Sequence, residues 1–166
     1  DQLGGIDVYS EYSFTTADGY YVQAGMNHFN GEEALSFSRE RYNVPGGDDQ
    51  RGKNQQAVIV AMIRKIISPQ ILMKASGLID SVSGNVETNM TQKQIQELVK
   101  MQLSEGCSWN IYSAAASGTG GSDYTYSMPG ISVYVTYPDK EAVDNIKNLM
   151  DRVEDGEMLD GSEVAE

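Results

Sequence analysis

The 166-residue chain contains one cysteine and one histidine, and these scarcities exclude several kinds of chemistry. Cys107 has no second thiol with which to form an internal disulfide, and it cannot supply the spaced thiolates of a zinc or iron–sulfur site. His28 lies in the turn-like stretch "MNHFNG" and has no serine partner that the sequence identifies, so a hydrolase triad is not supported. We expect structural roles for both residues.

The chain also lacks the sequence signals of nucleotide-binding and membrane-spanning proteins. Neither GxxxxGK[ST] nor GxGxxG occurs, so no nucleotide-binding loop of either type is predicted. No stretch reaches the roughly 18 apolar residues of a membrane span, and no signal peptide opens the chain. The chain begins at Asp1 inside what reads as a strand-and-turn region, so we expect an excised fragment from which targeting segments were removed.

Positive charge is scarce overall, because the formal net charge is -12. Seven acids and one arginine fall between Asp151 and Glu166, so half of that charge lies in the last sixteen residues. This composition predicts an acidic, disordered tail over residues 153–166. The remaining body is only mildly acidic and offers no broad basic surface, so we expect no nucleic-acid partner.

Against this background, the stretch "SRERYNVPGGDDQRGKNQQ", Ser38–Gln56, is unusually basic. It holds three of the five arginines in the chain, Arg39, Arg41 and Arg51, together with Lys53. A local basic cluster in an acidic protein indicates a small anionic target.

The surrounding sequence predicts helices separated by strands. The segment "GGIDVYSEYSF" is typical of a strand, and Asn30 with Glu33 has the spacing of a capping box that opens a short helix over residues 31–38. After Pro45-Gly46-Gly47, either Asp48 or Asp49 is predicted to cap a longer helix that runs to about Ile67.

More helices and strands are predicted after the long helix. The helices are expected over residues 70–82, from Thr91 to about Leu103, and from Pro138-Asp139 through Met150. The strands are expected over residues 86–88, 109–114 and 131–136, and "SGTGGSD" is predicted to be a flexible loop. This alternation favours an α/β fold, a layered sheet with helices on both faces.

The long helix carries a stripe that changes character along its length. Val58, Ile59, Met62, Ile63, Ile66 and Ile67 recur at helical spacing. Followed toward the N-terminus in steps of four, the stripe passes from Ile63 and Ile59 to Gln55 and then Arg51. Such a polar start indicates a polar partner opposite these side chains.

Two further arginines precede this helix. Arg39 and Arg41 point to one side if the backbone is extended there. Guanidinium groups gathered near a helix N-terminus suit a phosphate or pyrophosphate, since each offers a planar fork of donors. The alternative is a solvated loop whose arginines pair with acidic neighbours, namely Glu40, Asp48 and Asp49.

The order of these motifs resembles that of a known family. "NGEEALSFSRER", a glycine-rich turn and then "DDQRGKNQQ", preceded by "LGGIDV", are similar to the LytR-CpsA-Psr family of cell-wall glycopolymer ligases. The resemblance implies that residues 1–152 are the C-terminal portion of a catalytic domain of the α/β/α type. It also implies a location on the extracytoplasmic face of the bacterial membrane, with an N-terminal membrane anchor that lies outside this chain.

The resemblance further implies the substrates. Such enzymes transfer a glycan, for example in teichoic acid or capsule attachment, from a polyprenyl-pyrophosphate carrier to peptidoglycan. By resemblance, Arg39, Arg41, Arg51 and Gln55 hold the pyrophosphate, and the three arginines stabilise charge on the leaving phosphate. Asp48 is expected to orient Arg51 or cap the helix rather than bind metal. Lys53 is expected to replace the basic residue that many members have where this chain has Asn54.

The resemblance also bears on the metal and on activity. The family's magnesium ligands are expected upstream of this chain, so Mg²⁺ is expected for the complete domain and no ligand is assigned here. The fragment alone is expected to be inactive.

Two alternatives to the enzyme remain open. The same arginines could instead serve a non-catalytic module that binds a phosphorylated lipid or anionic polymer. A purely structural domain with a solvated arginine loop is the third reading.

Overall fold

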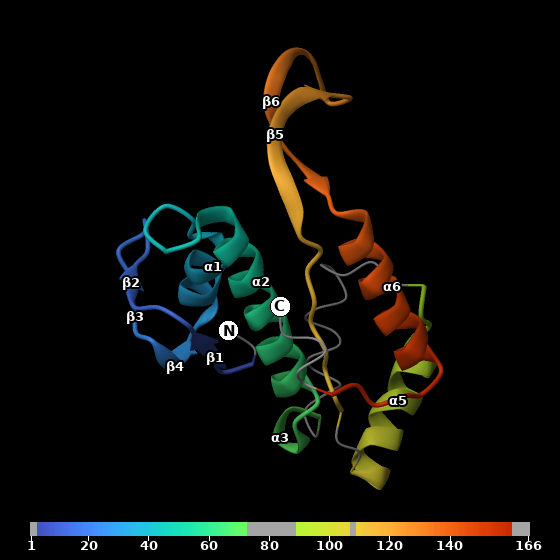
Figure 1. The fold of residues 1–166 in the computed structure, drawn as a ribbon. Coiled ribbons are helices and arrows are strands. Elements are labelled where there is room, and N and C mark those ends of the chain that lie inside the picture. The colour runs from blue at the N-terminus through green and yellow to red at the C-terminus, as the bar shows by residue number, and fades with distance from the viewer. Residues whose placement is uncertain (1–2, 73–88, 107–108, 161–166) are drawn as a thin grey trace. The chain divides into compact units, whose positions relative to one another are not determined.

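The computed structural model describes residues 3–72, 89–106 and 109–160, and the chain divides into two compact units, Asp1–Trp109 and Asn110–Glu166. The first unit holds two small antiparallel sheets and several helices, two of which pack on a sheet (Figure 1). Its described elements are β1 (Ile6–Ser10), β2 (Phe14–Thr15), β3 (Tyr21–Val22), β4 (Gly25–Phe29), α1 (Gly31–Arg39), α2 (Gly47–Ile66), α3 (Pro69–Leu72) and α5 (Gln92–Glu105). The second unit holds β5 (Gly118–Thr125), β6 (Met128–Pro138) and α6 (Lys140–Glu154).

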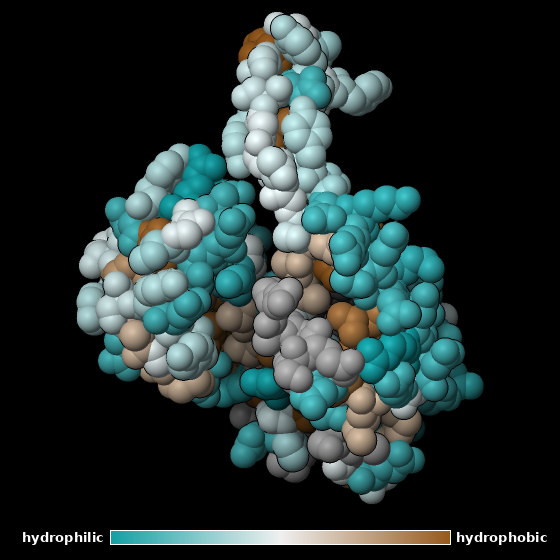
Figure 2. Space-filling model, viewed as in Figure 1, coloured by the Kyte–Doolittle hydropathy of each residue, from teal (hydrophilic) through white to brown (hydrophobic). Residues whose placement is uncertain are grey.

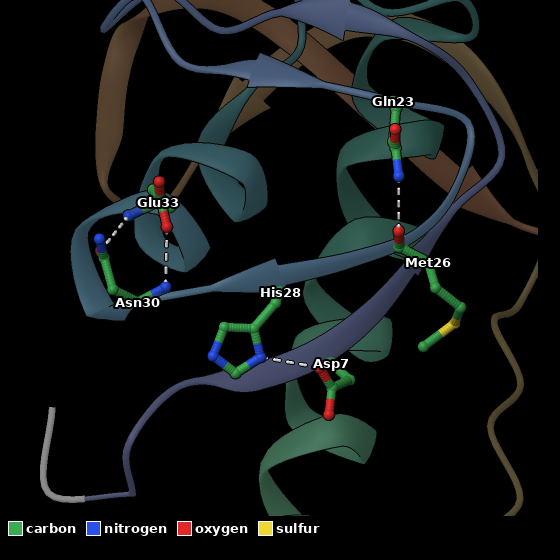
Figure 3. A network of polar contacts seen from close by, with 6 residues as sticks. All are labelled: Asp7, Gln23, Met26, His28, Asn30 and Glu33. Carbon is green, nitrogen blue, oxygen red and sulfur yellow. Dashed lines mark hydrogen bonds and ion pairs between the residues drawn. The ribbon is translucent and has the colours of Figure 1, made fainter.

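The strand predicted near the N-terminus is confirmed as β1. β1 pairs with β4, and its residues alternate between buried and exposed, with Ile6, Val8 and Ser10 inward. On the outer face Asp7 lies opposite His28, and Asp7 Oδ1 is 2.8 Å from His28 Nδ1 (Figure 3). The only histidine therefore has the structural role expected of it, as one half of an exposed cross-strand pair.

The capping box predicted at Asn30 is also confirmed, and it opens α1. Asn30 Oδ1 accepts a hydrogen bond from the backbone N–H of Glu33, and Glu33 Oε2 accepts one from the Asn30 N–H (Figure 3). Asn30 Oδ1 also accepts from the Glu32 N–H. These bonds satisfy donors that the first turn of a helix otherwise leaves unpaired. The helix thus starts at a fixed point and ends at Arg39.

The long helix α2 forms where predicted, but its cap differs from the prediction. Its N-cap is Gly46, in the left-handed conformation with φ of 84°, and no side chain caps the first turn. Asp48 and Asp49 lie inside that turn rather than at the cap, so the predicted capping role is wrong. Glycine is favoured at Gly46 because a left-handed backbone carries a steric penalty for residues with a Cβ.

The core of the first unit forms where α1 meets the two small sheets. Phe37 is 0 % exposed, and its ring centroid is 5.3 Å from that of Phe29 and 5.9 Å from that of Phe14. Rings at these separations combine extensive apolar burial with favourable aromatic contact. Residues from β1, β3, α1, α2 and the loop before α2 complete this core, namely Ile6, Val8, Val22, Ala34, Val44 and Ala61.

The buried side of α2 is not the isoleucine stripe. Its buried residues are Gln50, Asn54 and Ala61, and Ala57 and Val58 also pack against the core. The stripe predicted from the periodicity does lie along one side of the helix, but Ile59, Met62, Ile63 and Ile66 are exposed. Close packing on β1 and α1 is achieved through small alanines, which periodicity alone does not distinguish from the larger apolar residues.

In the second unit, the segment predicted to be a flexible loop is strand β5, so that prediction is wrong. β5 and β6 form an antiparallel hairpin, and glycines occur in β5 because tyrosine rings of β6 lie across the backbone. A Cβ at Gly121 would come within 2.7 Å of the Tyr137 ring, and one at Gly120 would clash with Tyr134. Tyr137 Oη donates to Asp123 Oδ2 at 2.8 Å. Figure 2 shows the hairpin surface mostly in pale colours, of intermediate hydropathy.

The remaining predictions for the second half have mixed outcomes. The strand at residues 131–136 lies within β6, but residues 109–114 are not a strand. The helices predicted from Thr91 and after Asp139 are confirmed as α5 and α6, and Thr91 with Gln94 forms the expected capping box. The predicted strand at 86–88, most of the helix at 70–82, and Cys107 lie outside the described residues.

The beginning of the acidic C-terminal segment is attached to α6. This helix continues to Glu154, and Arg152 Nε donates to Glu157 Oε2 at 2.9 Å. Leu159 is buried, and its N–H donates to Tyr112 Oη at 3.0 Å. The disordered tail was predicted from residue 153; residues 153–160 have defined contacts, and residues 161–166 lie outside the described part.

The α/β class predicted from the sequence is confirmed, although the described strands lie in three two-stranded sheets. Within residues 3–72, 89–106 and 109–160, no helix has both the length and the apolar character needed to cross a membrane.

We predict that Phe37→Ala will destabilise the protein by about 3–5 kcal/mol, because it removes a fully buried ring and leaves a cavity between Phe14 and Phe29. Leu35→Ala on the exposed side of α1 is the control, with an expected loss of less than about 1 kcal/mol. Urea unfolding followed by circular dichroism measures both changes. Equal losses in the two variants would contradict the assignment of Phe37 to the core.

Candidate anion-binding site

The arginines singled out in the sequence lie on both sides of one short connection. Arg39 is the last residue of α1, Arg41 lies in the connection to α2, and Arg51 is in the second turn of α2. Arg39 and Arg41 are exposed, and the Arg51 side chain is 33 % exposed. The backbone of Arg41 lies close to the start of α2: a Cβ added to Gly47 would be 3.7 Å from the Arg41 carbonyl oxygen.

Glu40, between the first two arginines, points the other way. It is only 3 % exposed, and its carboxylate accepts hydrogen bonds from the backbone N–H groups of Ala17, Arg41, Tyr42 and Asn43 at 2.6–3.0 Å, with a weaker bond from Asn43 Nδ2 at 3.4 Å. Burial by itself would raise the pKa of Glu40. The N–H donors of Asn43, Tyr42, Ala17 and Arg41 outweigh that effect, so the pKa lies below its usual value.

Arg41 contacts the aromatic ring beside it. The guanidinium carbon of Arg41 lies 4.5 Å from the centroid of the Tyr42 ring, and Arg41 Nη2 donates to Tyr42 Oη. The hydrogen bond to Tyr42, the charge interaction with Tyr42 and that with Asp48 raise the pKa of Arg41. Tyr42 is 78 % exposed, so this pair presents a cation and an aromatic surface together to solvent.

Arg51 is held by Asp48, one turn earlier on α2. Arg51 Nη2 lies 2.7 Å from Asp48 Oδ1, and the Asp48 side chain is 62 % exposed. An ion pair in such contact with water contributes about 0–1 kcal/mol, so its main effect is on the orientation of Arg51. Asp48 thus contacts the Arg51 guanidinium, and its role in orienting that group at a ligand stays a prediction.

The remaining predicted site residues are placed by the geometry of α2. Gln55 is exposed and lies one turn beyond Arg51, about 40° further around the helix axis, so the two project from one side. Lys53 is also exposed but lies about 200° from Arg51 around the axis. Helix geometry therefore associates Gln55 with Arg51 more closely than it does Lys53.

A buried polar pair lies on the inner side of the same turns. Gln50 Nε2 donates to Asn54 Oδ1 at 3.1 Å, and both residues are buried. Asn54 is 2 % exposed, and within the described ranges its Nδ2 has no hydrogen-bond partner. Position 54, where the family resemblance implies a basic residue in many members, is thus occupied here by a buried amide.

An apolar cavity of about 300 Å³ lies between β1, β4, α1 and α2. Its lining includes Leu3, Ile6, Phe29, Ala34, Val58 and Met62. Val58 and Met62 follow Arg51 by two and three turns, and both lie within about 20° of it around the helix axis. One side of α2 therefore carries a cation near its start and apolar cavity-lining residues further along.

The residues that the structure describes do not form a metal site. In residues 3–72, 89–106 and 109–160, no three His, Cys, Asp or Glu side chains are gathered closely enough to hold a metal ion. Asp48 is paired with Arg51. The side chains described here therefore do not fit a magnesium ion, and no step of the chemistry is assigned to one.

Sequence reasoning missed three features of this region. The inward direction of Glu40 has only a weak signal, an acid placed directly after a helix end. The Arg41–Tyr42 contact has none, because it depends on the side-chain conformations of two neighbouring residues in the connection. The burial of Gln50 with Asn54 has none either, because it depends on which side of α2 meets the core. The predicted convergence of Arg39, Arg41, Arg51 and Gln55 on one cleft stays a prediction.

The chain is similar to known proteins in both sequence and structure. The model of the LytR_cpsA_psr family matches residues 1–152. The chain belongs to this family. Relatives include the polyisoprenyl-teichoic acid–peptidoglycan teichoic acid transferase TagU of Bacillus mycoides (strain KBAB4), 36 % identical over 100 residues, which are 60 % of this chain and 33 % of that protein. The TagU of Enterococcus faecalis (strain ATCC 700802 / V583) is 32 % identical over 96 residues, 58 % of this chain and 31 % of that protein.

Solved structures agree with the family assignment. Bacillus subtilis TagV matches with a TM-score of 0.67 at 25 % identity, over 92 % of this chain and 58 % of that chain. Bacillus subtilis TagU matches with a TM-score of 0.62 at 26 % identity, over 100 % of this chain and 59 % of that chain. The match covers about a third of the length of the two TagU relatives from Bacillus mycoides and Enterococcus faecalis.

We predict that Glu40→Gln will lower the free energy of unfolding at pH 7 by about 1–3 kcal/mol, because the amide presents an N–H to backbone donors. The folded pKa of Glu40 is below the ordinary value of 4.5 for a glutamate, so the charged carboxylate stabilises the fold above that pH. This contribution is lost as the pH falls through the lowered folded pKa.

The difference in unfolding free energy between wild type and Glu40→Gln should therefore narrow below about pH 4.5. Urea titrations of both proteins from pH 3 to pH 7 measure it, and the subtraction removes the carboxylates that both share. A difference that stays constant across this range would contradict the lowered pKa.

Proposed function

We propose that this chain is part of an enzyme that transfers an anionic glycopolymer, such as a teichoic acid or capsule polymer, from a polyprenyl-pyrophosphate carrier to peptidoglycan. The observation that carries the proposal is the arrangement along α2, where Arg51 is followed on the same side by Val58 and Met62 of the apolar cavity. A polyprenyl pyrophosphate is likewise an anion joined to a hydrocarbon. The TagU relatives are named as polyisoprenyl-teichoic acid–peptidoglycan teichoic acid transferases, and this name supports the same donor and acceptor classes.

In this proposal, a sugar hydroxyl of peptidoglycan forms a bond to the phosphate on the glycan side, the bond between the two phosphates breaks, and the carrier leaves as polyprenyl phosphate. Arg39, Arg41 and Arg51 bind the pyrophosphate and stabilise the charge that develops on the leaving phosphate. Gln55 donates a further hydrogen bond from one turn beyond Arg51. Asp48 keeps the Arg51 fork in position, since it pairs with one guanidinium nitrogen and leaves the others free to donate to the ligand. Lys53 has at most a long-range electrostatic role.

The first turn of α2 adds to the attraction. No side chain caps this turn, and the positive end of the helix dipole lies there. Asp48 and Asp49 offset part of that field, so the arginines must supply most of the positive charge.

We further propose that the protein acts on the extracytoplasmic face of the membrane, held there by an anchor outside this chain, and that its acceptor is peptidoglycan. The proposed magnesium ion would be bound by parts of the domain that this chain does not contain. A module that binds the same lipid without catalysis remains the alternative, and it would bind donor without turnover.

We predict that Arg51→Lys will reduce glycan transfer nearly as much as Arg51→Ala, by about 100-fold or more, because lysine keeps the charge but loses the planar fork. The assay uses a form of the protein as long as the solved relatives, with a polyprenyl-pyrophosphate glycan as donor. Arg64→Lys, on α2 away from the site, is the matched control and should be active.

Each outcome of that assay is informative. Wild-type turnover in Arg51→Lys would show that charge alone matters at this position. Donor binding by wild type without any transfer would favour the non-catalytic module. Unfolding curves for each variant separate loss of function from loss of fold.

A further inference from the structure

We infer that Glu40 is a positioning residue for the anion site, since it fixes the backbone from which Arg39 and Arg41 project. This inference rests on the proposed function, because it assumes that these arginines bind an anion. It does not make Glu40 a partner of the anion, because its carboxylate lies on the inner side of the connection.

The hydrogen-bonding capacity of Glu40 is already filled. Oε1 accepts from the N–H groups of Arg41, Tyr42 and Asn43 at 3.0, 2.8 and 3.0 Å, and Oε2 accepts from the Ala17 N–H at 2.6 Å. A carboxylate has about four lone-pair sites, so little remains for a guanidinium group. The acid next to both arginines therefore does not occupy their guanidinium donors. Among the residues that the structure describes, the only one of these donors with a partner is Arg41 Nη2, which donates to the exposed Tyr42 Oη.

These bonds fix the conformation of the connection and also its attachment to the rest of the first unit. Three successive N–H groups turned toward one oxygen set the course of the backbone over residues 41–43. The bond from Ala17 then joins this segment to the turn between β2 and β3. That turn is in turn bound to α1, where Ser36 Oγ donates to Asp18 Oδ2 at 2.6 Å and lies 2.8 Å from Thr16 Oγ1.

Arg39 and Arg41 consequently extend from a backbone that is held on both sides of Glu40. Arg39 closes a helix whose buried residues include Ser36 and Phe37, and Arg41 is the first residue of the segment that Glu40 holds. Val44, three residues on, is buried in the core. A change at Glu40 would displace the arginines without removing either of them.

Positioning and simple electrostatics predict opposite effects of one substitution. Glu40→Gln removes a negative charge adjacent to two arginines, so Coulomb attraction alone predicts tighter anion binding. Loss of positioning predicts weaker binding, by about 10-fold, since small displacements of binding groups have large effects. A residue that only stabilises the fold would leave the affinity of the folded protein unchanged.

The experiment is a calorimetric titration of pyrophosphate into the 166-residue chain at fixed ionic strength, for wild type, Glu40→Gln and Glu40→Asp. Glu40→Asp keeps the charge but shortens the side chain, so any weakening in this variant cannot come from charge. Glu32→Gln is the matched control, an exposed glutamate on α1 whose Oε2 accepts from Tyr20 Oη at 3.2 Å. Each protein is titrated where unfolding curves show it to be folded.

We expect Glu40→Gln to bind about 10-fold more weakly than wild type, Glu40→Asp to lie between them, and Glu32→Gln to match wild type. In the same variants, hydrogen exchange of the amides of residues 41–43 should be faster than in wild type. Equal or tighter binding by Glu40→Gln would overturn the inference, as would wild-type affinity in Glu40→Asp if Glu40→Gln does not fold.

Arg51→Ala tests the proposed function in the same titration. Weaker binding in Arg51→Ala together with unchanged binding in the Glu40 variants would retain the anion site and overturn the positioning role. Unchanged binding in Arg51→Ala, or no binding by wild type, would show that the anion site itself is wrongly assigned, and the inference would fall with it.

Discussion

The region between α1 and α2 depends on a single buried charge. A carboxylate removed from water is strongly destabilising unless hydrogen bonds replace its hydration, and Glu40 is 3 % exposed. The chain meets this requirement with backbone donors from two places, the residues directly after Glu40 and Ala17 of the β2–β3 turn. The conformation of the connection is thus set by the need to satisfy one side chain.

In this connection, the negative side chain points into the protein and the positive side chains point to solvent. The acid points inward to N–H groups, whereas Arg39 and Arg41 are exposed on either side of it. Arg41 rests on Tyr42, and Arg51 pairs with the exposed Asp48, so two of the three guanidinium groups have weak partners in contact with water. Such partners restrict the side chains yet give way easily to a ligand with more charge, because exposed pairs contribute little free energy.

The parts of this arrangement that the sequence predicted are those governed by local chemistry. The capping boxes at Asn30 and Thr91 each depend on two residues three positions apart, and both are present as predicted. The start of α2 was misassigned because a glycine in the left-handed conformation, Gly46, can begin a helix without a side-chain cap. Asp48 was then available to pair with Arg51.

Predictions that required knowledge of the neighbouring surface failed. Periodicity identified the apolar stripe through Ile59 and Ile63, but the core contacts the side of α2 that carries Ala57 and Ala61. The glycine run in β5 was read as a loop because its composition does not reveal tyrosines that lie across it. Each error concerns a contact between segments, which a single-sequence pattern does not specify.

Asn54 shows why a departure from the family pattern can be consistent with the same site. Position 54 faces the core, beside Gln50, and a guanidinium group there would have to be buried or bend outward. A neutral amide is easier to bury, although its Nδ2 lacks a partner among the residues described. An amide at this inner position leaves the outer side of α2 unaffected, and Arg51 and Gln55 project from that outer side. In our proposal the charge that faces an anion is carried by the outer side of α2, so it does not depend on which residue is buried at position 54.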